Sequence, residues 1–253
     1  MPIVTTDAVV LHGFDYLETS RILRLATREA GVQSVLARGA RRSRSRFGMA
    51  LDLFAGGVAE IHLKAGRDLQ SLASFDVSHA RTALADDLDR FVAASALAEL
   101  MLRFAGDDAQ ESLFDALIDA LDAIAGAPAQ RARETALSGA WRLVAELGFA
   151  PSVDRCASCH ADVAPDLPAP FSHPHGGVLC PRCAPFLRAS RTLPATGRAS
   201  LRGWVVGERG EHLSDGETRA HQRLLREFLQ EHLTDGRPLR AYDVWERGSW
   251  IGT

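Results

Sequence analysis

The chain has 253 residues, of which 46% are hydrophobic and 24% charged, and its formal net charge is −3. This composition is typical of a folded globular protein and excludes a largely disordered chain. No apolar run reaches the roughly 20 residues that a membrane helix needs, and residues 1–14 lack the basic and apolar regions of a secretory signal. We therefore expect a cytoplasmic protein, in whose reducing environment cysteines serve as metal ligands more often than as disulfides.

Charge is divided unevenly along the chain. Residues 1–80 carry 10 basic and 8 acidic side chains, residues 81–150 carry 6 and 12, and residues 151–253 carry 13 and 12. Such asymmetry is typical of a chain built from distinct modules. The negative total therefore does not exclude a segment that binds nucleic acid.

Residues 1–80 have the pattern of a small β domain. Short runs of β-branched or apolar residues alternate with glycine-containing turns, and in one run Leu23 and Leu25 fall on the opposite face from Arg24 and Arg28. The predicted strands are Thr6–His12, Ser20–Thr27, Val32–Arg38, Met49–Phe54, Val58–Lys64 and Leu69–Phe75. Five or six short strands of this kind indicate an antiparallel barrel of the OB or SH3-like type.

From residue 81 onward the hydrophobic period becomes that of helices. Apolar stripes predict helices at Leu84–Phe104, Glu111–Ala125 and Ala129–Leu147, and Ser214 with Glu217 forms a capping box that opens a helix ending near Leu233. The predicted fold class is therefore a multi-domain α+β protein. Its expected parts are an N-terminal OB-fold barrel at 1–80, a helical bundle at 81–150, an inserted four-cysteine module at 151–193, and a C-terminal helical segment at 194–253 that packs on the bundle.

Two C-x2-C pairs, formed by Cys156, Cys159, Cys180 and Cys183, predict a metal site. Each tight turn supplies two thiolates, and two such turns complete a tetrahedron, which favours one structural zinc ion per chain. Two disulfides or unliganded thiols are the alternatives. His173 and His175 lie between the pairs and are alternative ligands, although such histidines more often belong to the connecting turn.

Motifs of several enzyme classes are absent from the sequence. There is no H-x-E motif of a zinc deaminase, no H-E-x-x-H, no P-loop lysine and no G-x-G-x-x-G after a strand. The acidic stripe at Asp115, Asp119 and Asp122 is interpreted as a solvated helix face, and the acids at 86–89 as the favoured start of a helix. We therefore predict a protein that is not an enzyme.

An arginine-rich segment between two predicted strands predicts phosphate contacts. Arg38, Arg41, Arg42, Arg44 and Arg46 lie within nine residues that contain no acid, and Arg21 and Arg24 precede them on the neighbouring strand. Each guanidinium can pair with a phosphate and release counterions. Aromatic side chains that could stack on bases are Phe14, Tyr16, Phe47 and Phe54, with burial in the core as the alternative.

Taken together, these features resemble the RecO family of bacterial DNA repair proteins. The residues that carry the resemblance are Val9–His12 (VVLH), Glu18–Arg21 (ETSR) and Arg38–Arg42 (RGARR), followed by the helical region and the four-cysteine insert. The resemblance covers essentially the whole chain. It departs from the family in one respect, since the basic loop here contains arginine only, whereas lysine is commonly mixed in.

The resemblance implies a recombination mediator of the RecF pathway, associated with the bacterial nucleoid. Such proteins bind single- and double-stranded DNA, anneal complementary strands, and act with RecR to load RecA onto DNA coated by single-strand-binding protein. The family also binds the C-terminal tail of single-strand-binding protein in its helical region. For that tail we consider a site on the last predicted helix, at Arg219, Arg223, Arg226 and Phe228. The competing hypotheses are a zinc-stabilised protein–protein adaptor without direct DNA binding and, less favoured, a hydrolase or transferase that uses the acidic groups.

Overall fold

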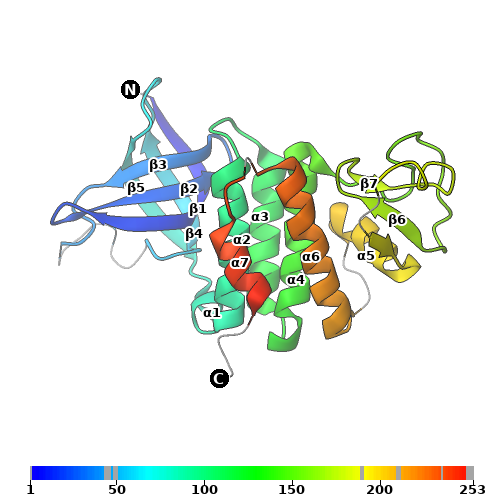
Figure 1. The fold of residues 1–253 in the computed structure, drawn as a ribbon. Coiled ribbons are helices and arrows are strands. Elements are labelled where there is room, and N and C mark those ends of the chain that lie inside the picture. The colour runs from blue at the N-terminus through cyan, green and yellow to red at the C-terminus, as the bar shows by residue number, and fades with distance from the viewer. Residues whose placement is uncertain are drawn as a thin grey trace.

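The computed structural model describes residues 2–42, 47, 51–188, 191–208, 212–234 and 236–248. It is elongated, with a barrel at one end, helices in the middle, and a small sheet at the other end (Figure 1). Among the described residues, no helix combines the length and the apolar character needed to span a membrane.

The N-terminal part is a closed five-stranded barrel with OB-like topology. Its strands follow the spatial order β1-β2-β3-β5-β4, with β1 paired to both β2 and β4, and with β3 parallel to β5. The strands are β1 Ile3–Tyr16, β2 Ser20–Thr27, β3 Gly31–Ala37, β4 Gly56–His62 and β5 Gln70–His79. The predicted barrel is confirmed, and Leu23 and Leu25 are fully buried inside it while Arg24 is half-buried on the other face.

The strand predicted at Met49–Phe54 is wrong over its described part, because Leu51–Phe54 contains turns rather than a strand. Phe54 has a φ of 65° and is buried. Its backbone N–H donates to Val10 O at 2.8 Å, and Ala55 O accepts from Val10 N at 3.0 Å. Leu51 is buried in the barrel interior and Phe54 in the core of the helices, so this turn segment has the apolar residues of a buried strand without being one.

The helical part begins directly after the barrel. Its first elements are α1 Thr82–Ala85, α2 Leu88–Phe104, α3 Glu111–Gly126, η1 Ala129–Arg131, α4 Ala132–Val144 and η2 Ala145–Phe149. They confirm the three predicted helices of this region. Asp87 is the N-cap of α2 and accepts from Arg90 N at 2.9 Å, so the acids at 86–89 do mark a helix start.

The C-terminal part adds α5 Ala195–Val205, α6 Asp215–His232 and α7 Arg240–Arg247. The capping box of α6 is confirmed, with Ser214 and Glu217 in their reciprocal roles. Helix α7 was not predicted. It packs against α2, and the carboxylate of Glu99 on α2 accepts from the backbone N–H groups of Arg240, Ala241 and Tyr242 at 2.8 to 3.0 Å.

The barrel has its own apolar interior, and part of its outer face packs into the apolar core of the helices. Ala8 and Val10 point into the barrel, whereas Val9 and Leu11 point outward and pack in the cluster that contains the helices. Strand β1 is thus buried on both faces over these residues, which explains its uninterrupted apolar run. Gly31 completes the junction, since its φ is 58° and an added Cβ would lie 2.5 Å from Asp108 O.

Two arginines of the barrel region pair with the acidic stripe of α3. Arg28 Nη1 donates to Asp115 Oδ2 at 3.1 Å and its guanidinium lies 5.4 Å from the Phe114 ring centroid. Arg81 Nε donates to Asp122 Oδ1 at 2.6 Å. The stripe was predicted to be a solvated face. Asp115 and Asp122 are in fact about half exposed, and both lie at the junction with the barrel.

The four-cysteine module lies at the far end from the barrel (Figure 1). It is built on a three-stranded sheet of order β7-β6-β8, with β6 Ala169–Ser172, β7 Gly177–Val178 and β8 Arg191–Leu193. Phe171 and Val178 of this sheet join the same apolar cluster as the helices. The cysteines instead form a small separate cluster with Leu179 at its centre.

Candidate nucleic-acid interface and metal centre

The β1–β2 turn and the arginine-rich turn after β3 lie against each other. Arg41 N donates to Thr19 O at 2.9 Å, and Arg41 Nη1 donates weakly to Glu18 O at 3.5 Å. Gly39 has a φ of 72°, which turns the chain back so that Arg42 N reaches Gly39 O at 3.1 Å. The ETSR and RGARR motifs, about 20 residues apart in sequence, therefore form one surface.

Three arginines of this surface are exposed, namely Arg38, Arg41 and Arg42. The carboxylate of Asp15 lies 3.4 Å from Arg41 Nε and 3.8 Å from Arg21 Nε. Arg21 is more buried and donates to Leu51 O at 3.0 Å, so it also holds the turn segment that precedes β4. One carboxylate thus offsets part of the charge of two guanidinium groups, and the surface stays cationic.

An exposed aromatic row runs along the outer face of β1 next to this surface. Phe14 is 47% and Tyr16 40% exposed, and His12 lies in line with them at a ring separation of 6.1 Å from Phe14. In the register of β1 and β2, His12 pairs with Arg24. Directly paired residues of an antiparallel ladder share a face of the sheet, so Arg24 flanks the aromatic row.

The four cysteines converge from two separate turns. Their sulfur atoms all lie within 4.8 Å of one another, and Cys159 Sγ and Cys180 Sγ are 3.7 Å apart. A disulfide would need sulfurs about 2.05 Å apart, and all four cysteines are free. A tetrahedral metal site with M–S bonds of about 2.3 Å has sulfur–sulfur edges of roughly 3.8 Å. The donor set and its spacing therefore fit a metal ion bound by four thiolates.

Backbone hydrogen bonds prepare these thiols for a metal. Burial alone would raise the pKa of Cys156, but backbone N–H groups around it, including that of Cys180, outweigh burial and lower this pKa to about 6. The pKa of Cys180 is also lowered, chiefly by the backbone N–H of Cys183. Cys183 has the opposite shift, to about 12, because of its contact with the Cys159 thiol. Cys183 is therefore expected to lose its proton readily only when a cation lies at the centre of the cluster.

Comparisons with known proteins place the chain in a family. The family model described as Recombination protein O N terminal matches residues 1–81, and the one described as Recombination protein O C terminal matches residues 85–241. The chain belongs to the RecO family. It is 39% identical over 246 residues to the DNA repair protein RecO of Anaeromyxobacter sp. (strain K), covering 94% of each chain. It is 32% identical over 255 residues to that of Frankia casuarinae, covering 98% of this chain and all of the relative.

The structure of this RecO-family chain separates the predicted DNA-binding residues into three groups. Arg38, Arg41 and Arg42 are exposed and adjacent, while Arg44 and Arg46 lie outside the described residues. Arg21 and Arg24 both lie on β2 but have different neighbours. Arg21 lies near Asp15, and Arg24 lies beside the aromatic row. Sequence reasoning did not single out Asp15 or His12, whose roles depend on the pairing register of β1 and β2.

Two of the four aromatic candidates for base stacking are wrong. Phe47 and Phe54 are only 2% and 1% exposed and belong to the apolar cores. Phe14 and Tyr16 are the exposed pair. Phe14 and Tyr16 face outward with His12 because the register of β1 and β2 shifts between Val10 and His12, so alternation along the strand alone could not have shown it.

The site considered on α6 for the protein tail also needs correction. Phe228 is 2% exposed and packs on Trp141 and Phe171, at ring separations of 5.3 and 6.3 Å. Arg226 is paired with Glu246 at 3.0 Å. Only Arg219 and Arg223 remain exposed. The proposed combination of arginines with an apolar anchor is therefore not available on this helix.

The alternative histidine ligands are engaged elsewhere. His173 is buried, and its Nε2 lies 3.0 Å from Glu227 Oε2. Burial lowers the pKa of His173 even though the nearby Glu227 acts in the opposite direction. His175 Nδ1 lies 3.0 Å from Ser172 Oγ. Neither histidine belongs to the sulfur cluster, so the ligand set contains the four cysteines only.

Proposed function

We propose that this RecO-family protein is a DNA repair and recombination mediator that binds single- and double-stranded DNA and anneals complementary strands without a chemical step. The observation that carries the proposal is the contact between Arg41 and Thr19, which joins the two family motifs into one cationic surface. Two strands bound to such a surface are screened from mutual repulsion and raised in local concentration, so they pair faster.

In this proposal the arginines bind the backbone and the aromatic row binds bases. Arg38, Arg41, Arg42, Arg44 and Arg46, with Arg21 and Arg24, contact phosphates of either single strands or duplex. Phe14 and Tyr16 can stack only on bases that are unpaired, and such stacking contributes about 1–3 kcal/mol per base. The outer face of β1 therefore adds a preference for single strands to a surface that otherwise binds any nucleic acid.

The DNA-binding part is tested by anisotropy of a labelled single-stranded oligonucleotide over a series of salt concentrations. Wild type is compared with a variant in which Arg38, Arg41 and Arg42 are all changed to Ala, and with a matched control in which Arg219 and Arg223 are changed. We expect tight, salt-sensitive binding by wild type and control, with affinity and salt slope both reduced in the triple variant. Equal binding by all three would move the DNA site elsewhere. An absence of binding by wild type at low salt would instead support the protein–protein adaptor.

A second comparison isolates the aromatic row. Phe14→Ala with Tyr16→Ala should weaken binding to a single strand about tenfold or more while changing duplex binding little. The control is Ile3→Ala, which removes another exposed apolar side chain of β1, 57% exposed, away from the arginines. Equal losses on single strands and duplex would show that the row acts through folding rather than by stacking.

We further propose that the cysteine module binds one structural zinc ion. The ion would be held by Cys156, Cys159, Cys180 and Cys183, and four thiolates leave no open position for catalysis. Bound there, zinc supplies the cross-link that holds the two turns of the module together. Metal analysis should find one zinc per chain, and changing Cys159 to Ser should abolish it. A full zinc content in the Cys159 variant would contradict this ligand set.

The partner proteins of the mediator belong to the same proposal. We infer that the chain acts with RecR to load RecA onto DNA coated by single-strand-binding protein, and that it binds the C-terminal tail of the latter. We assign these roles to the division expected from the sequence, with DNA on 1–80 and proteins on the helices of 81–150 and 194–253, braced by 151–193. Pull-down with RecR and titration with a tail peptide test this part, and an absence of binding to both would contradict it.

A further inference from the structure

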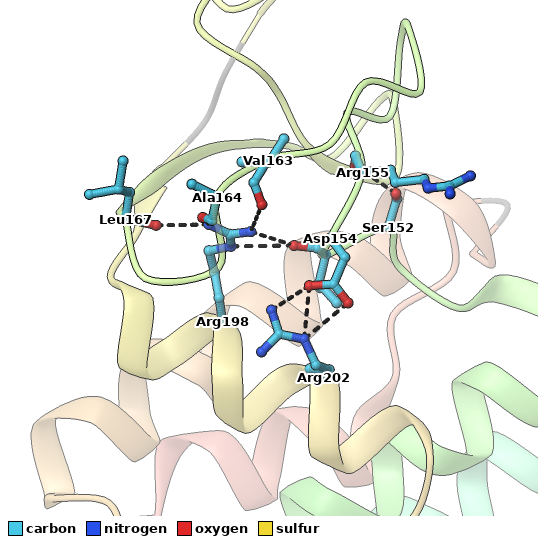
Figure 2. Close-up of polar contacts among 9 residues, drawn as sticks. Ser152, Asp154, Arg155, Val163, Ala164, Leu167, Arg198 and Arg202 are labelled. Atoms are coloured by element: carbon cyan, nitrogen blue, oxygen red, sulfur yellow. Dashed lines mark hydrogen bonds and ion pairs between the residues drawn. The ribbon is translucent and has the colours of Figure 1, made fainter.

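Arg198 of α5 is fully buried, and no carboxylate of the described residues forms an ion pair with it. The five N–H groups of its guanidinium donate to four backbone carbonyls. Nε and Nη2 reach Val153 O at 3.3 and 2.8 Å, Nη2 also reaches Val163 O at 3.1 Å, and Nη1 reaches Ala164 O and Leu167 O at 2.6 and 2.8 Å. An arginine has five such donors, so every one of them is used (Figure 2).

The four carbonyls belong to the two ends of one loop. Between them the chain turns back on itself, with Val163 N donating to Asp154 O at 2.9 Å and Cys156 N donating to Ala161 O at 2.8 Å. Cys156 and Cys159 lie at the tip of this small hairpin, and Val153 and Val163 lie at its base. The guanidinium thus lies across the base, where it holds both strands of the hairpin as a bound cation would.

A second arginine one helical turn later fastens the same loop. Arg202 Nε donates to both carboxylate oxygens of Asp154, at 2.8 and 3.0 Å (Figure 2). This pair lowers the pKa of Asp154 and raises that of Arg202, chiefly through the hydrogen bond between them. Residues 198 and 202 share one face of α5 because their spacing is four. Helix α5 therefore binds the cysteine hairpin through two side chains.

We infer that Arg198 is a positioning residue of the metal site, and that it couples the binding of metal to the stability of the helical body. It fixes the base of the hairpin that carries Cys156 and Cys159. Their thiolates therefore lie close to those of Cys180 and Cys183 before a metal binds. Outer-shell groups of this kind typically change metal affinity about 10- to 100-fold when they are removed. The inference rests on the proposed metal site.

The coupling has a direct thermodynamic consequence. A metal that binds only the folded module stabilises whatever unfolds together with that module. Helix α5 packs on α4 and contributes the buried side chains of Leu201 and Trp204 to the central apolar cluster. With Arg198 in place, metal removal should therefore lower the melting temperature of the helices. Without it, this lowering should be smaller, because fewer contacts join the module to the helices.

The test measures metal release and melting in four full-length proteins. They are wild type, Arg198→Met, Arg198→Lys and Arg155→Met. Arg155 is the matched control, because it adjoins Cys156 in sequence while its side chain is 70% exposed and lies 3.4 Å from the carboxylate of Asp162. Each protein is loaded with Zn2+, release to a chromophoric chelator is timed, and the melting of the helical circular dichroism signal is recorded with and without metal.

We expect Arg198→Met to release zinc about 10- to 100-fold faster than wild type, with Arg198→Lys between them and Arg155→Met unchanged. We also expect the metal-dependent shift in melting temperature to shrink in Arg198→Met. A general loss of stability would lower the loaded and stripped proteins equally and leave that shift intact, which would overturn the inference. If wild type binds no zinc, the proposed metal site fails together with the inference, whereas equal release by wild type and Arg198→Met overturns the inference alone.

Should Arg198→Met fail to fold, Arg198→Lys decides the matter. Lysine keeps the charge but offers three donors in place of five and lacks the planar fork. A lysine variant that folds and releases zinc faster than wild type supports positioning by the guanidinium. A lysine variant with wild-type release shows that a buried positive charge is sufficient and contradicts it.

Discussion

The carboxylate of Asp15 lies between two guanidinium groups, 3.4 Å from Nε of Arg41 and 3.8 Å from Nε of Arg21. Both partners belong to the motifs that form the proposed DNA surface. A carboxylate in this position holds the arginine side chains in place, yet it also repels the phosphate that would replace it. The effect of removing this carboxylate on DNA affinity therefore shows whether Asp15 mainly repels phosphate or mainly holds the arginines in place.

Asp15→Asn should increase the affinity for single-stranded DNA. The change frees about one cation for phosphate contact, which steepens the dependence of log K on log salt by about 0.7 for single strands. At low salt we expect an affinity gain of severalfold, measured by anisotropy. Asp68→Asn, an exposed acid of the loop before β5, controls for the change in net charge. A weaker complex would mean that Asp15 acts mainly by holding Arg41.

Arg28→Met should destabilise the protein without affecting DNA binding. Arg28 lies near Arg24 in sequence, but it pairs with Asp115 and packs over the Phe114 ring at the junction of barrel and helices. The hydrogen bond with Asp115 is also the main cause of its raised pKa. Loss of a half-exposed ion pair and a cation–π contact should cost about 1–2 kcal/mol. Urea unfolding measures this, and a parallel DNA titration should be unchanged.

If Arg28→Met instead weakened DNA binding to the extent of the Arg38, Arg41 and Arg42 variant, the proposed surface would have to extend across the junction. The side chain is 30% exposed, and three acids surround it, namely Asp7, Glu111 and Asp115. Such surroundings disfavour the approach of a phosphate. This is the reason for expecting no effect.

Glu99→Ala should loosen helix α7. The Glu99 carboxylate accepts three first-turn N–H groups of α7, at 2.8, 2.9 and 3.0 Å, and loss of a cap costs about 1–2 kcal/mol. We expect lower stability in urea and faster hydrogen exchange at Tyr242 and its neighbours. Glu231→Ala, an exposed acid of α6, should show neither change. Unchanged exchange in the Glu99 variant would mean that packing alone holds α7.

Acid should destabilise the protein through His221. Burial lowers the pKa of His221 to about 4, although Glu217 acts weakly in the opposite direction, and its ring packs edge-on against Trp204 at 4.8 Å. The unfolded histidine titrates near 6.5. The contribution of neutral His221 to the free energy of unfolding is therefore fully present above about pH 6.5 and is lost as the pH falls toward 4. Between pH 7 and 5 the free energy of unfolding should fall by about 2 kcal/mol.

The measurement is the free energy of unfolding in urea at several pH values. His221→Phe keeps an aromatic ring against Trp204 and removes the titration, so its stability should depend less on pH over this range. His79→Phe changes an exposed histidine and should retain the wild-type slope. His173, whose pKa is also lowered by burial, accounts for a remaining dependence of the same sign. A His221 variant with the full wild-type slope would contradict this assignment.

Local patterns in the sequence determined most of the elements of this protein. The period-two pattern around Leu23 and Leu25 and the capping box of Ser214 and Glu217 depend on residues close together in the chain, and both are confirmed. The C-x2-C spacing likewise predicted that each tight turn holds a pair of thiols. The four thiols do lie together in the structure. These predictions succeeded because the interactions that decide them are local.

Contacts between residues far apart in sequence could be seen only in the folded structure. The sequence is compatible with Phe54 in a strand or a stacking platform, but hydrogen bonds between its segment and Val10 hold it in a turn, where its ring packs on Phe91. Helix α7 is short and polar, and its N-terminus is capped by Glu99, 141 residues away from Arg240. No local pattern contains such partners, so propensity could not reveal these elements.

The same division holds for the two sites. The arginine cluster and the two C-x2-C pairs could be predicted from the sequence, since each is a short local pattern. Only the fold showed that Thr19 and Arg41 meet, that Arg28 belongs to a junction, and that Arg198 holds the cysteine hairpin from a helix more than 30 residues later. Burial and pairing depend on which distant segments pack together, and that is decided by the free energy of the whole core rather than by any one segment.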